Sequence, residues 1–547
     1  MKSTILLLSI LLLPSYLHPQ VGSFVAKGHL IGSDGKPMSF SNVQYISNSP
    51  DLPRSILKTV RVAQDGTFEL PFPAPGLYRL RFTGIDHRPQ TVRVLLEKPE
   101  PVFLTVRLKG HELFESLSHI RMITDFNSFS REKSLAMTVQ PDGTFMATMR
   151  TKADTIAYQI TGVEERTAIN GTQSDYSVVS SEGDYYSVIR VTSDSVSIIF
   201  DPAKLRNNKS NASVSFADER ALPSRYYAFE QAVYSMEEPI SAAFDAHMAS
   251  GKKSSDFDYN YASVRSQALA LRESEPDPTL KNAWLLAAAC EFRGAKQDSS
   301  FATLVLNSIS PADLLWSFDP RNMTECIAGT REPGKHISYL QRAIDTHSDQ
   351  DIKPHLIYSL LYYARSAGAD SLVSTYYRKL ATEFPASPSL ALAKPVFDPS
   401  RSLQAGKSLP DFSAVSLDDP TVVFTKKGLL GTIYLIDFWA IWCQPCVNQI
   451  KYVSPAYERF KSKGFKVLSA SFDQTPEQVA KFRKERWPMP WFHTHVKLGG
   501  QDPFAKLFEI KQIPKHVLVG ADGRILAVDD GLFGEELELT LSKIFAQ

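Results

Sequence analysis

The sequence predicts a multidomain protein with two all-β units, an α-helical region and a C-terminal α/β domain. About 100 to 200 residues make one domain, so a chain of 547 residues predicts three or four domains. Apolar residues alternate with polar ones to about residue 205 and recur every three to four positions from about 217 to 392. Beyond about residue 410, strand-like and helix-like runs alternate.

The composition is that of an ordinary globular chain. Hydrophobic residues make up 43% and charged residues 22%, which excludes collagen-like, coiled-coil and wholly disordered classes. The 60 Lys and Arg residues stand against 59 Asp and Glu residues, for a net charge of +1, and no block of like charge is present. Nucleic acid is therefore not an expected partner.

Residues 1–20 have the pattern of a cleaved signal peptide. Lys2 supplies the positive charge, Ile5 to Leu13 is almost wholly apolar, and Pro14 ends the run. A membrane-spanning helix needs about 20 apolar residues, so permanent anchoring through this run is the weaker interpretation. The first cysteine is Cys290, so no lipid anchor is expected at this end. We expect an exported protein of the cell envelope, in the periplasm.

Residues 22–108 predict a β-sandwich unit, and residues 109–205 predict a second β unit of the same style. The string Gln64 to Phe68 has a near echo in Pro141 to Phe145, and an Asp-Gly turn before Thr-Phe is a common hairpin. The first unit resembles the carboxypeptidase regulatory-like sandwiches of exported bacterial proteins through Gly28-His29-Leu30-Ile31, the Gly35-Lys36-Pro37 turn and the Asp65-Gly66-Thr67-Phe68 strand. A sandwich of another family is the alternative.

Residues 217–394 predict an α-helical domain, because the apolar period changes from two to between three and four. Two helical hairpins can be superimposed, since Gly294 and Pro311 have the same separation as Gly368 and Pro385. The spacing of these residues resembles that of a tetratricopeptide repeat. A plain α-helical domain is the alternative, because the aromatic and small positions of the repeat are only partly filled.

Residues 401–547 predict an α/β domain in which strands and helices alternate. A continuous apolar strand is interrupted only by Asp437, and a later helix begins with Pro476 at its first position. The expected elements are a strand at 433–439, a helix at 446–463, a strand at 466–472, a helix at 475–485, a hairpin of strands at 517–519 and 525–528, and a helix at 535–545.

Cys443 and Cys446 form a Cys-x-x-Cys pair at the start of the first of these helices. A thiolate attacks disulfides, and a helix N-terminus favours the anionic form of Cys443. Cys446, one turn further on, faces the same side and can resolve the mixed disulfide. The alternative is half of a zinc site, but Cys290 and Cys326 lie in another domain. We therefore expect a redox disulfide with no metal and no other cofactor.

Three motifs carry a family resemblance. Ile436 to Cys446 resembles the thioredoxin superfamily signature of Phe-Trp-Ala followed by Trp-Cys-x-Pro-Cys. Gly406 to Phe412, and Ile513 to Val519 with Asp522-Gly523, resemble the entry motif and the cis-proline strand of exported TlpA-like thiol-disulfide oxidoreductases. The resemblance covers about 140 residues. It implies a thioredoxin-like fold, disulfide-containing protein substrates and a membrane thiol electron donor.

The resemblance also implies roles for single residues. Asp437 is expected to lie buried beneath the cysteine pair and to accept a proton as Cys446 reacts; a strand-end Asp with a structural hydrogen bond is the alternative. Pro514 is expected to be cis, with Ile513 offering backbone groups to an extended substrate opposite Cys443. The other expected substrate-binding residues are Trp442, Gln444 and Pro445. For Trp439, core packing is as good an interpretation as shielding of the pair.

Two features depart from the simplest TlpA-like pattern. Members commonly have Cys-x-x-Glu-x-Pro after the second cysteine, whereas Cys446 is followed by Val-Asn-Gln-Ile-Lys, so the carboxylate and the proline are both missing. His493 and His495 project to one face of a strand and could hold copper, with a solvated strand end as the favoured alternative. Cys290 is interpreted as a buried thiol, and a structural Cys290-Cys326 disulfide as the alternative.

The preferred interpretation is an exported thiol-disulfide oxidoreductase that reduces protein disulfides. The rival is an envelope binding or scaffold protein in which the thioredoxin-like domain is accessory or regulatory. The intact cysteine pair, with Asp437 and Pro514, favours catalysis.

Overall fold

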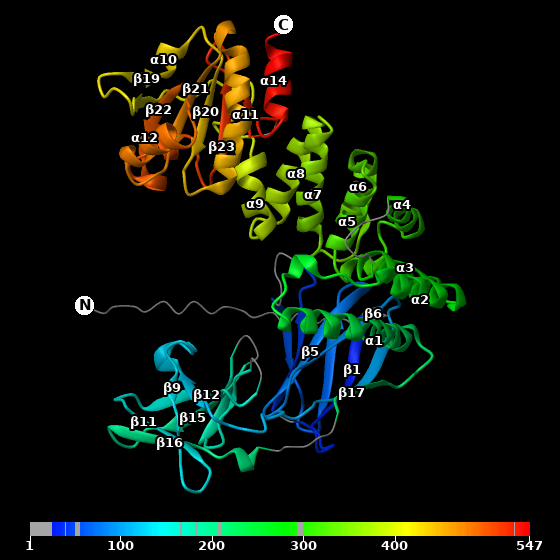
Figure 1. Ribbon diagram of the computed structural model, residues 1–547. Helices are drawn as coiled ribbons and strands as arrows, with labels where there is room; N and C mark the ends of the chain where they lie inside the picture. The colour runs from blue at the N-terminus through cyan, green and yellow to red at the C-terminus, as the bar shows by residue number, and fades with distance from the viewer. Residues whose placement is uncertain are drawn as a thin grey trace, which may run out of the picture. The chain divides into compact units, whose positions relative to one another are not determined.

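A computed structural model describes residues 24–38, 40–49, 55–164, 167–180, 184–205, 211–292, 299–529 and 531–546. The predicted signal peptide, residues 1–20, lies outside the described residues. The chain divides into two compact units, Met1–Phe397 and Asp398–Gln547, and Figure 1 traces their elements along the chain. Within the ranges just given, no helix is both long and apolar enough to span a bilayer.

Two four-stranded sheets enclose the first core of the N-terminal unit. The strands are β1 (Phe24–Ile31), β2 (Ser41–Ile46), β3 (Ile56–Arg61), β4 (Thr67–Phe72), β5 (Gly76–Gly84), β6 (Gln90–Leu96), β7 (Pro101–Arg107) and β17 (Ser213–Phe216). The strand orders are β17-β7-β1-β4 and β3-β2-β5-β6. Leu30, Leu80 and Val106, from both sheets, are fully buried in the shared core, as the strand alternation predicts.

Strand β17 completes the first sheet although it follows the second β region in the chain. It pairs antiparallel with β7, and Val214 lies opposite Val106. The sequence pattern predicts no strand between residues 205 and 217, because four residues with two apolar positions carry a weak signal. The first β region is therefore closed by the segment that leads into the helices.

The second β region has its own core, which contains Met122, Ile156 and Phe200. One sheet has the order β10-β11-β16, and the other has the order β14-β15-β12-β8-β9 with β13 beside β12. The strands are β8 (Arg121–Thr124), β9 (Leu135–Ala136), β10 (Thr138–Val139), β11 (Phe145–Arg150), β12 (Thr155–Thr161), β13 (Ile169–Asn170), β14 (Tyr176–Val179), β15 (Tyr185–Arg190) and β16 (Ser195–Phe200).

The two Asp-Gly turns have the same local structure. Asp65 and Asp142 each accept hydrogen bonds from the backbone N–H and the hydroxyl of the threonine two residues further on. The second turn closes the hairpin of β10 and β11. The strands on either side of the first turn, β3 and β4, belong to different sheets. The hairpin interpretation is thus confirmed for the second turn and wrong for the first, because turn chemistry does not fix which strands pair.

Nine helices follow within the described part of the N-terminal unit. They are α1 (Leu222–Ala249), α2 (Tyr261–Ser274), α3 (Pro278–Cys290), α4 (Ser299–Ser308), α5 (Arg321–Gly329), α6 (Ile337–Thr346), α7 (Lys353–Ser366), α8 (Asp370–Glu383) and α9 (Pro388–Phe397). The leucines at matching positions of the two superimposed hairpins are all buried in one core: Leu286, Leu306, Leu360 and Leu380.

The C-terminal unit is built on a five-stranded sheet with the order β22-β21-β20-β23-β24. Strand β20 is parallel to β21 and antiparallel to β23. The strands of the unit are β18 (Ser413–Val415), β19 (Val423–Thr425), β20 (Tyr434–Trp439), β21 (Lys466–Ser471), β22 (Phe492–His495), β23 (Lys515–Val519) and β24 (Ile525–Val528). The helices are α10 (Lys426–Leu429), α11 (Gln444–Phe460), α12 (Pro476–Glu485), α13 (Pro503–Leu507) and α14 (Glu536–Ile544).

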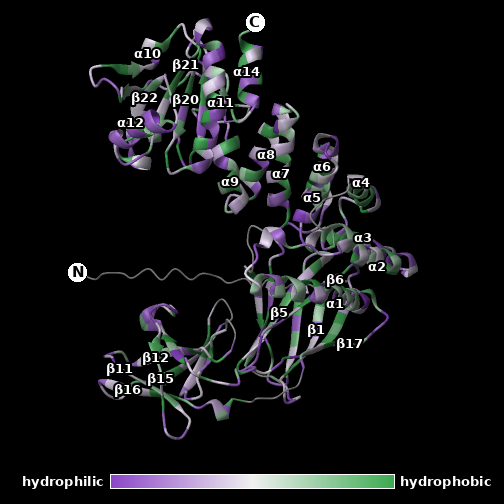
Figure 2. Cartoon of the chain, viewed as in Figure 1, coloured by the Kyte–Doolittle hydropathy of each residue, from purple (hydrophilic) through white to green (hydrophobic). Residues whose placement is uncertain are grey.

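All six residues of β20 are buried, and they divide between the two faces of the sheet. Leu435 and Trp439 belong to the core that contains residues of α11, α12 and α14, whereas Ile436 and Phe438 pack with α13 on the other face. Because side chains alternate along a strand, Asp437 points to the α11 face. Figure 2 shows hydrophobic residues along the strands of this sheet and a mostly hydrophilic α12.

The expected succession of strands and helices is confirmed in this unit, although several boundaries differ: α11 ends at Phe460 and not at 463, and β23 begins at Lys515 and not at 517. Helix α11 begins at Gln444, two residues before the expected start at Cys446. Cys443 acts as the N-cap, and Pro445 lies in the first turn, where its missing N–H costs no hydrogen bond.

Candidate functional site

The site is built where β20 ends and α11 begins. Cys443 and Cys446 form a disulfide with a Cα–Cα distance of 5.2 Å. The backbone N–H of Cys446 donates to Sγ of Cys443 at 3.3 Å, so a helix-terminal donor points at the first sulfur. Cys443 is 6% exposed and Cys446 is 1% exposed. The first cysteine is thus the one that a partner can reach more readily.

The loop between β20 and the disulfide is held by Asp473, which the sequence analysis does not single out. Both carboxylate oxygens accept the backbone N–H of Ile441, at 3.0 and 3.2 Å. The hydroxyl of Ser471 donates to the same carboxylate at 2.8 Å. Asp473 is 5% exposed and lies two residues after the end of β21, so the neighbouring parallel strand fixes the approach to Cys443. Its position at the end of a predicted strand is the sequence signal that marks it.

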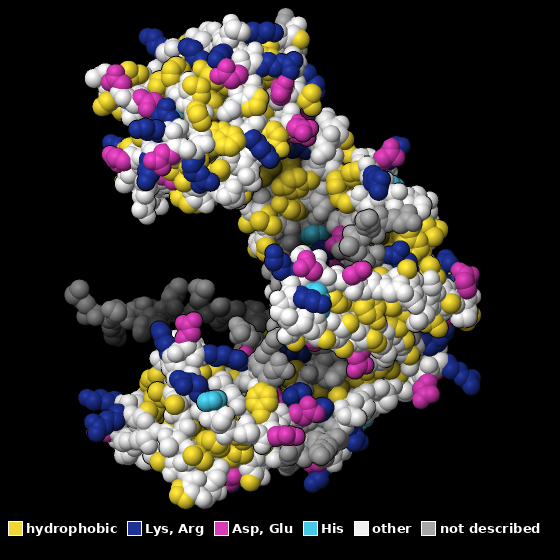
Figure 3. Space-filling model, in the orientation of Figure 1, with side chains coloured by type: hydrophobic (Ala, Val, Ile, Leu, Met, Phe, Trp, Pro, Cys, Tyr) yellow, Lys and Arg dark blue, Asp and Glu magenta, His cyan; other side chains and the backbone are white. Residues whose placement is uncertain are grey.

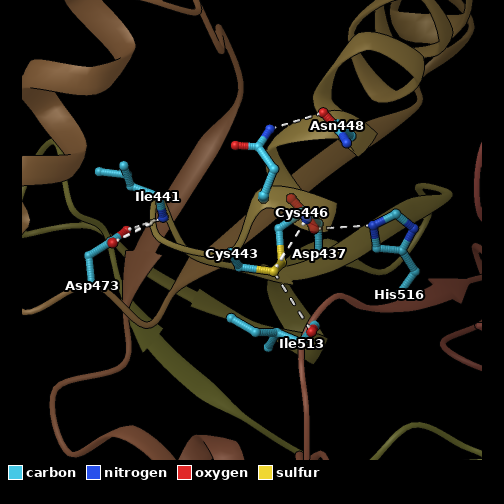
Figure 4. Close-up of a disulfide and its surroundings, with 9 residues drawn as sticks. Asp437, Ile441, Cys443, Cys446, Asn448, Asp473, Ile513 and His516 are labelled. Atoms are coloured by element: carbon cyan, nitrogen blue, oxygen red, sulfur yellow. Dashed lines mark hydrogen bonds and ion pairs between the residues drawn. A yellow bond between two sulfur atoms is a disulfide. The ribbon is translucent and has the colours of Figure 1, made fainter. Parts of the chain in front are cut away.

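Pro514 and Ile513 face the disulfide from the segment that precedes β23. The Ile513-Pro514 peptide bond is cis. Sγ of Cys443 lies 3.8 Å from the carbonyl oxygen of Ile513, and Figure 4 shows this carbonyl directed at the sulfur. The structure therefore brings together the motifs at residues 443–446 and 513–514.

Asp437 is buried, at 6% exposure, within a hydrogen-bond network. The hydroxyl of Ser469 donates to its Oδ2 at 2.9 Å, and Nε2 of His516 lies 3.1 Å from its Oδ1. Trp491 donates its indole N–H to the oxygen of Ser469 at 2.9 Å. Asp437 therefore has two polar partners, on β21 and on β23.

His516 is a second residue of the site that sequence reasoning misses. It lies directly opposite Asp437 in the pairing of β20 with β23 and is fully buried. Burial by itself lowers the pKa of His516, but the hydrogen bond and the charge of Asp437, with the Leu532 carbonyl, raise the pKa above its usual 6.5. Its signal in the sequence is a histidine in the strand that follows the expected cis-proline.

The remaining expected substrate-binding residues lie at the surface around the disulfide. Trp442 is 67% exposed. Gln444 and Pro445 are also exposed, and the side-chain amide of Gln444 donates to Asn448. Trp439, by contrast, is 1% exposed and packs on the ring of Phe482, so the core-packing interpretation is the right one for that residue.

A surface hollow of about 500 Å³ adjoins Trp442. Its lining combines the aromatic rings of Trp442 and Phe482 with the charged side chains of Lys481, Glu485 and Arg486. On the face drawn in Figure 3, acidic and basic side chains of the C-terminal unit are interspersed with hydrophobic ones. The surroundings of the disulfide thus offer mixed contacts to a polypeptide.

The histidines of β22 do not form a solvated strand end. His493 is fully buried and His495 is half-buried, and their Nε2 atoms lie 3.0 and 2.7 Å from the carbonyl oxygens of Met489 and Asp473. Burial, aided by the charge of Arg483, lowers the pKa of His493 to about 4. No group of three or more potential ligands for a metal occurs among the residues that the structure describes.

Strand β22 is an edge strand of the five-stranded sheet. The segment after β18 covers this edge, because Ser416 forms a β-bridge with Thr494.

Gln449 stands where TlpA-like proteins commonly have a glutamate. Its side-chain oxygen accepts the backbone N–H of Gly534 at 2.8 Å. The residue therefore links α11 to the segment before α14.

Cys290 and Cys326 are free thiols in the N-terminal unit, so the alternative of a structural disulfide between them is wrong in this structure.

A family model described as thioredoxin-like matches residues 431–525. The C-terminal domain is thioredoxin-like. This match covers β20, both cysteines and the cis-proline segment, which are the parts that build the site.

Curated relatives of this domain share a name. The thiol-disulfide oxidoreductase ResA of Bacillus cereus is 26% identical over 152 residues, covering 27% of this chain and 83% of the relative. The protein of the same name from Oceanobacillus iheyensis is 28% identical over 163 residues, covering 29% of this chain and 81% of the relative. These similarities support thiol-disulfide oxidoreductase activity.

Solved structures match a similar share of the chain. The thioredoxin domain of a thiol-disulfide oxidoreductase from Bacteroides vulgatus is 25% identical, with 26% of this chain and 99% of that chain covered and a TM-score of 0.24. A thiol:disulfide interchange protein from a Bacteroides species is 26% identical, with 27% and 93% covered and a TM-score of 0.24.

Proposed function

We propose that the protein is an exported, periplasmic thiol-disulfide oxidoreductase that reduces disulfides in protein substrates through Cys443-Gln444-Pro445-Cys446. The observation that carries the proposal is the placement of the cysteine pair. Cys443 caps α11 beneath a helix N–H and faces the Ile513 carbonyl, while Cys446 is buried behind it. An attacking thiolate and a shielded resolving thiol need this arrangement.

The reaction proceeds in two exchange steps. The Cys443 thiolate attacks one sulfur of the substrate disulfide, and the other substrate sulfur leaves with the bonding electron pair. Cys446 then loses its proton and attacks Cys443, which releases the second substrate sulfur as a thiolate and leaves the Cys443-Cys446 disulfide. The substrate gains two electrons and the protein loses two. A membrane thiol donor returns the pair to the dithiol state.

In this proposal, the residues around the cysteine pair take up a proton and bind the substrate. Asp437, on the α11 face of β20, takes the proton of Cys446. Pro514 and Ile513 hold an extended substrate opposite Cys443, since the Ile513 carbonyl already lies 3.8 Å from its sulfur. The exposed side chains of Trp442, Gln444 and Pro445 complete the substrate surface.

The domain division is part of the proposal. A signal peptide at 1–20 directs export, residues 22–108 and 109–205 are two β-sandwich-like domains, the first of which also includes strand β17, and residues 217–394 are a divergent helical-repeat domain. Residues 401–547 are the catalytic domain. The separation into units at residue 397 supports the last of these boundaries.

Trapping tests the proposal. A Cys446→Ser variant keeps the attacking cysteine but cannot resolve the mixed disulfide, so it is expected to accumulate adducts in cells that dithiothreitol releases. A Cys443→Ser, Cys446→Ser variant is the matched control and is expected to accumulate none. Absence of any reducible adduct on Cys446→Ser would contradict an oxidoreductase role in the cell.

A further inference from the structure

The site contains a buried pair of ionisable groups, Asp437 and His516. The two residues are direct neighbours across β20 and β23, and their side chains meet at 3.1 Å. Leu518, two residues after His516, packs in the core beneath α11, as Leu435 does on β20. Both side chains of the pair therefore point to the face that carries Cys446. Figure 4 shows the carboxylate and the imidazole directed at each other.

The hydrogen-bond partners of His516 fix one hydrogen on the imidazole and leave one proton that the pair can gain or lose. Nδ1 of His516 lies 2.7 Å from the Leu532 carbonyl oxygen, which only accepts, so Nδ1 carries a hydrogen. Nε2 faces Oδ1 of Asp437, and one further proton lies between these two atoms while the imidazole is protonated. The hydroxyl of Ser469 already donates to Oδ2 of Asp437. With that one proton, the pair is electrically neutral.

If the pair already holds its one titrating proton, the imidazole cannot pass on a second proton received from Cys446. Its far side ends at the Leu532 carbonyl, which does not carry protons away. If the pair is neutral and takes the proton of Cys446, it becomes a buried cation, and the nearest further carboxylate, Asp529, bonds the backbone of His516 and not its imidazole. Such a buried charge is costly. If His516 is neutral, the pair is an anion, and the same proton neutralises it.

Other titratable groups approach the pair from each neighbouring element. From β22 comes His493, whose pKa is lowered to about 4 and which stays neutral near pH 7. At the end of β24, Asp529 accepts the backbone N–H of His516 at 2.9 Å. Helix α11 contributes Cys446 and the uncharged Gln449, and the ring of Phe533 stacks on His516 at 4.6 Å. No lysine or arginine lies in hydrogen-bond contact with the pair among the described residues.

We propose that His516 is a positioning residue that decides when Asp437 can accept the proton of Cys446, so that resolution of the mixed disulfide accelerates as the Asp437-His516 pair loses its own proton. This inference rests on the proposed function. In the step concerned, the S–H bond of Cys446 breaks and its proton goes to Asp437. The S–S bond between Cys446 and Cys443 forms, and the substrate thiolate leaves with the electron pair.

The first test is the titration of His516 in the full-length oxidised protein. Histidine is labelled with ¹³C, and the His516→Gln variant assigns the signal. His516 is expected to titrate above about 6.5, the ordinary histidine value, and its midpoint is expected to fall in Asp437→Asn. A midpoint at or below the ordinary value, or one that Asp437→Asn leaves unchanged, would overturn the inference. This outcome does not depend on redox activity.

The second test measures the resolution step in single turnovers of the reduced full-length protein with a disulfide peptide. One pH unit below the His516 midpoint, the wild-type rate is expected to be about tenfold lower than its plateau. Gln at this position keeps a donor for Asp437 but cannot titrate, so His516→Gln is expected to lose this step of the profile. A His516→Phe variant removes the donor as well and is expected to resolve more slowly at every pH.

A matched control isolates the step. Formation of the mixed disulfide in Cys446→Ser depends on Cys443 alone and is expected to have the same rate with and without His516→Gln. If no mixed disulfide forms at all, the proposed function fails. If it forms and resolves with a pH profile that His516→Gln does not change, the role of His516 alone is refuted. Should the variants at 516 not fold, the His516 signal is assigned from its nuclear Overhauser contacts with the ring of Phe533, and the titration in wild type and Asp437→Asn decides.

Discussion

His516 and His493, two buried histidines of one sheet, have pKa shifts of opposite sign because their partners differ. Burial by itself lowers the pKa of both histidines. The hydrogen bond and the charge of Asp437 raise the pKa of His516 above its usual value, whereas at His493 the charge of Arg483 adds to the effect of burial and outweighs the hydrogen bond to the Met489 carbonyl, so its pKa falls to about 4. A raised histidine pKa stabilises the fold below about pH 6.5, and this stability is lost as the pH rises through the pKa that the histidine has in the folded state. A lowered histidine pKa stabilises the fold above about 6.5, and this stability is lost as pH falls.

The free energy of unfolding of the C-terminal unit is therefore expected to fall between about pH 6.5 and pH 4. Over that range the unfolded chain protonates His493 while the folded chain does not, and the pKa difference corresponds to about 3 kcal/mol. His493→Gln keeps a donor for the Met489 carbonyl and is expected to remove most of this loss. Urea unfolding at each pH, followed by tryptophan fluorescence, measures the free energy of unfolding of the wild type and the variant. An equal loss in wild type and variant would show that His493 is not the cause.

Asp473 is expected to matter more for stability than an exposed aspartate with similar local bonds. Asp473→Asn presents an amide to donors from Ile441 and Ser471, and we expect a loss of about 1 to 3 kcal/mol. Asp419 is exposed and bonds only within its own turn, so Asp419→Asn is expected to cost much less. Denaturant midpoints of the two variants give the comparison, and equal midpoints would argue against the proposed support of the loop.

Helix α11 is the element that we expect to activate the cysteine pair. Its first turn directs the Cys446 N–H and the positive end of the helix dipole at Sγ of Cys443. We expect the alkylation rate of Cys443 to have a midpoint below about 8.5, the value of an ordinary thiol. Iodoacetamide labelling against pH measures it in a Cys446→Ser variant that also carries Cys290→Ala and Cys326→Ala, so that Cys443 is the one remaining thiol. A midpoint at or above that value would contradict the assigned role of the helix terminus.

Contiguous sequence motifs explain why most residues of the candidate site could be predicted. Cys443, Cys446 and Asp437 lie within one strand-loop-helix segment, and Pro514 carries its own motif, so local patterns suffice to find them. His516 and Asp473 reach the site only through strand pairing and through the adjacency of parallel strands. Strand β17 returns to β7 across the whole second β region for the same reason. Sequence periodicity predicts elements, but it does not specify which distant strands become neighbours.

At the scale of the whole molecule, the division into two compact units separates the preferred function from its rival. All residues of the proposed redox site lie in Asp398–Gln547. If the protein is an oxidoreductase, this fragment is expected to reduce insulin disulfides at a rate within about threefold of the full chain, since no part of the chemistry lies upstream. An inactive but folded fragment would mean that the N-terminal unit takes part in the reaction.

The most direct test of the central claim is insulin reduction by the full-length chain with dithiothreitol as electron source. The assay uses a Cys290→Ala, Cys326→Ala background, so that only the proposed redox cysteines remain. We expect this protein to accelerate precipitation of the reduced insulin chains, and we expect the further Cys443→Ser substitution to abolish the acceleration. Failure of the first protein to accelerate the reaction, or equal activity of the Cys443→Ser variant, would contradict catalysis by the Cys443-Cys446 dithiol.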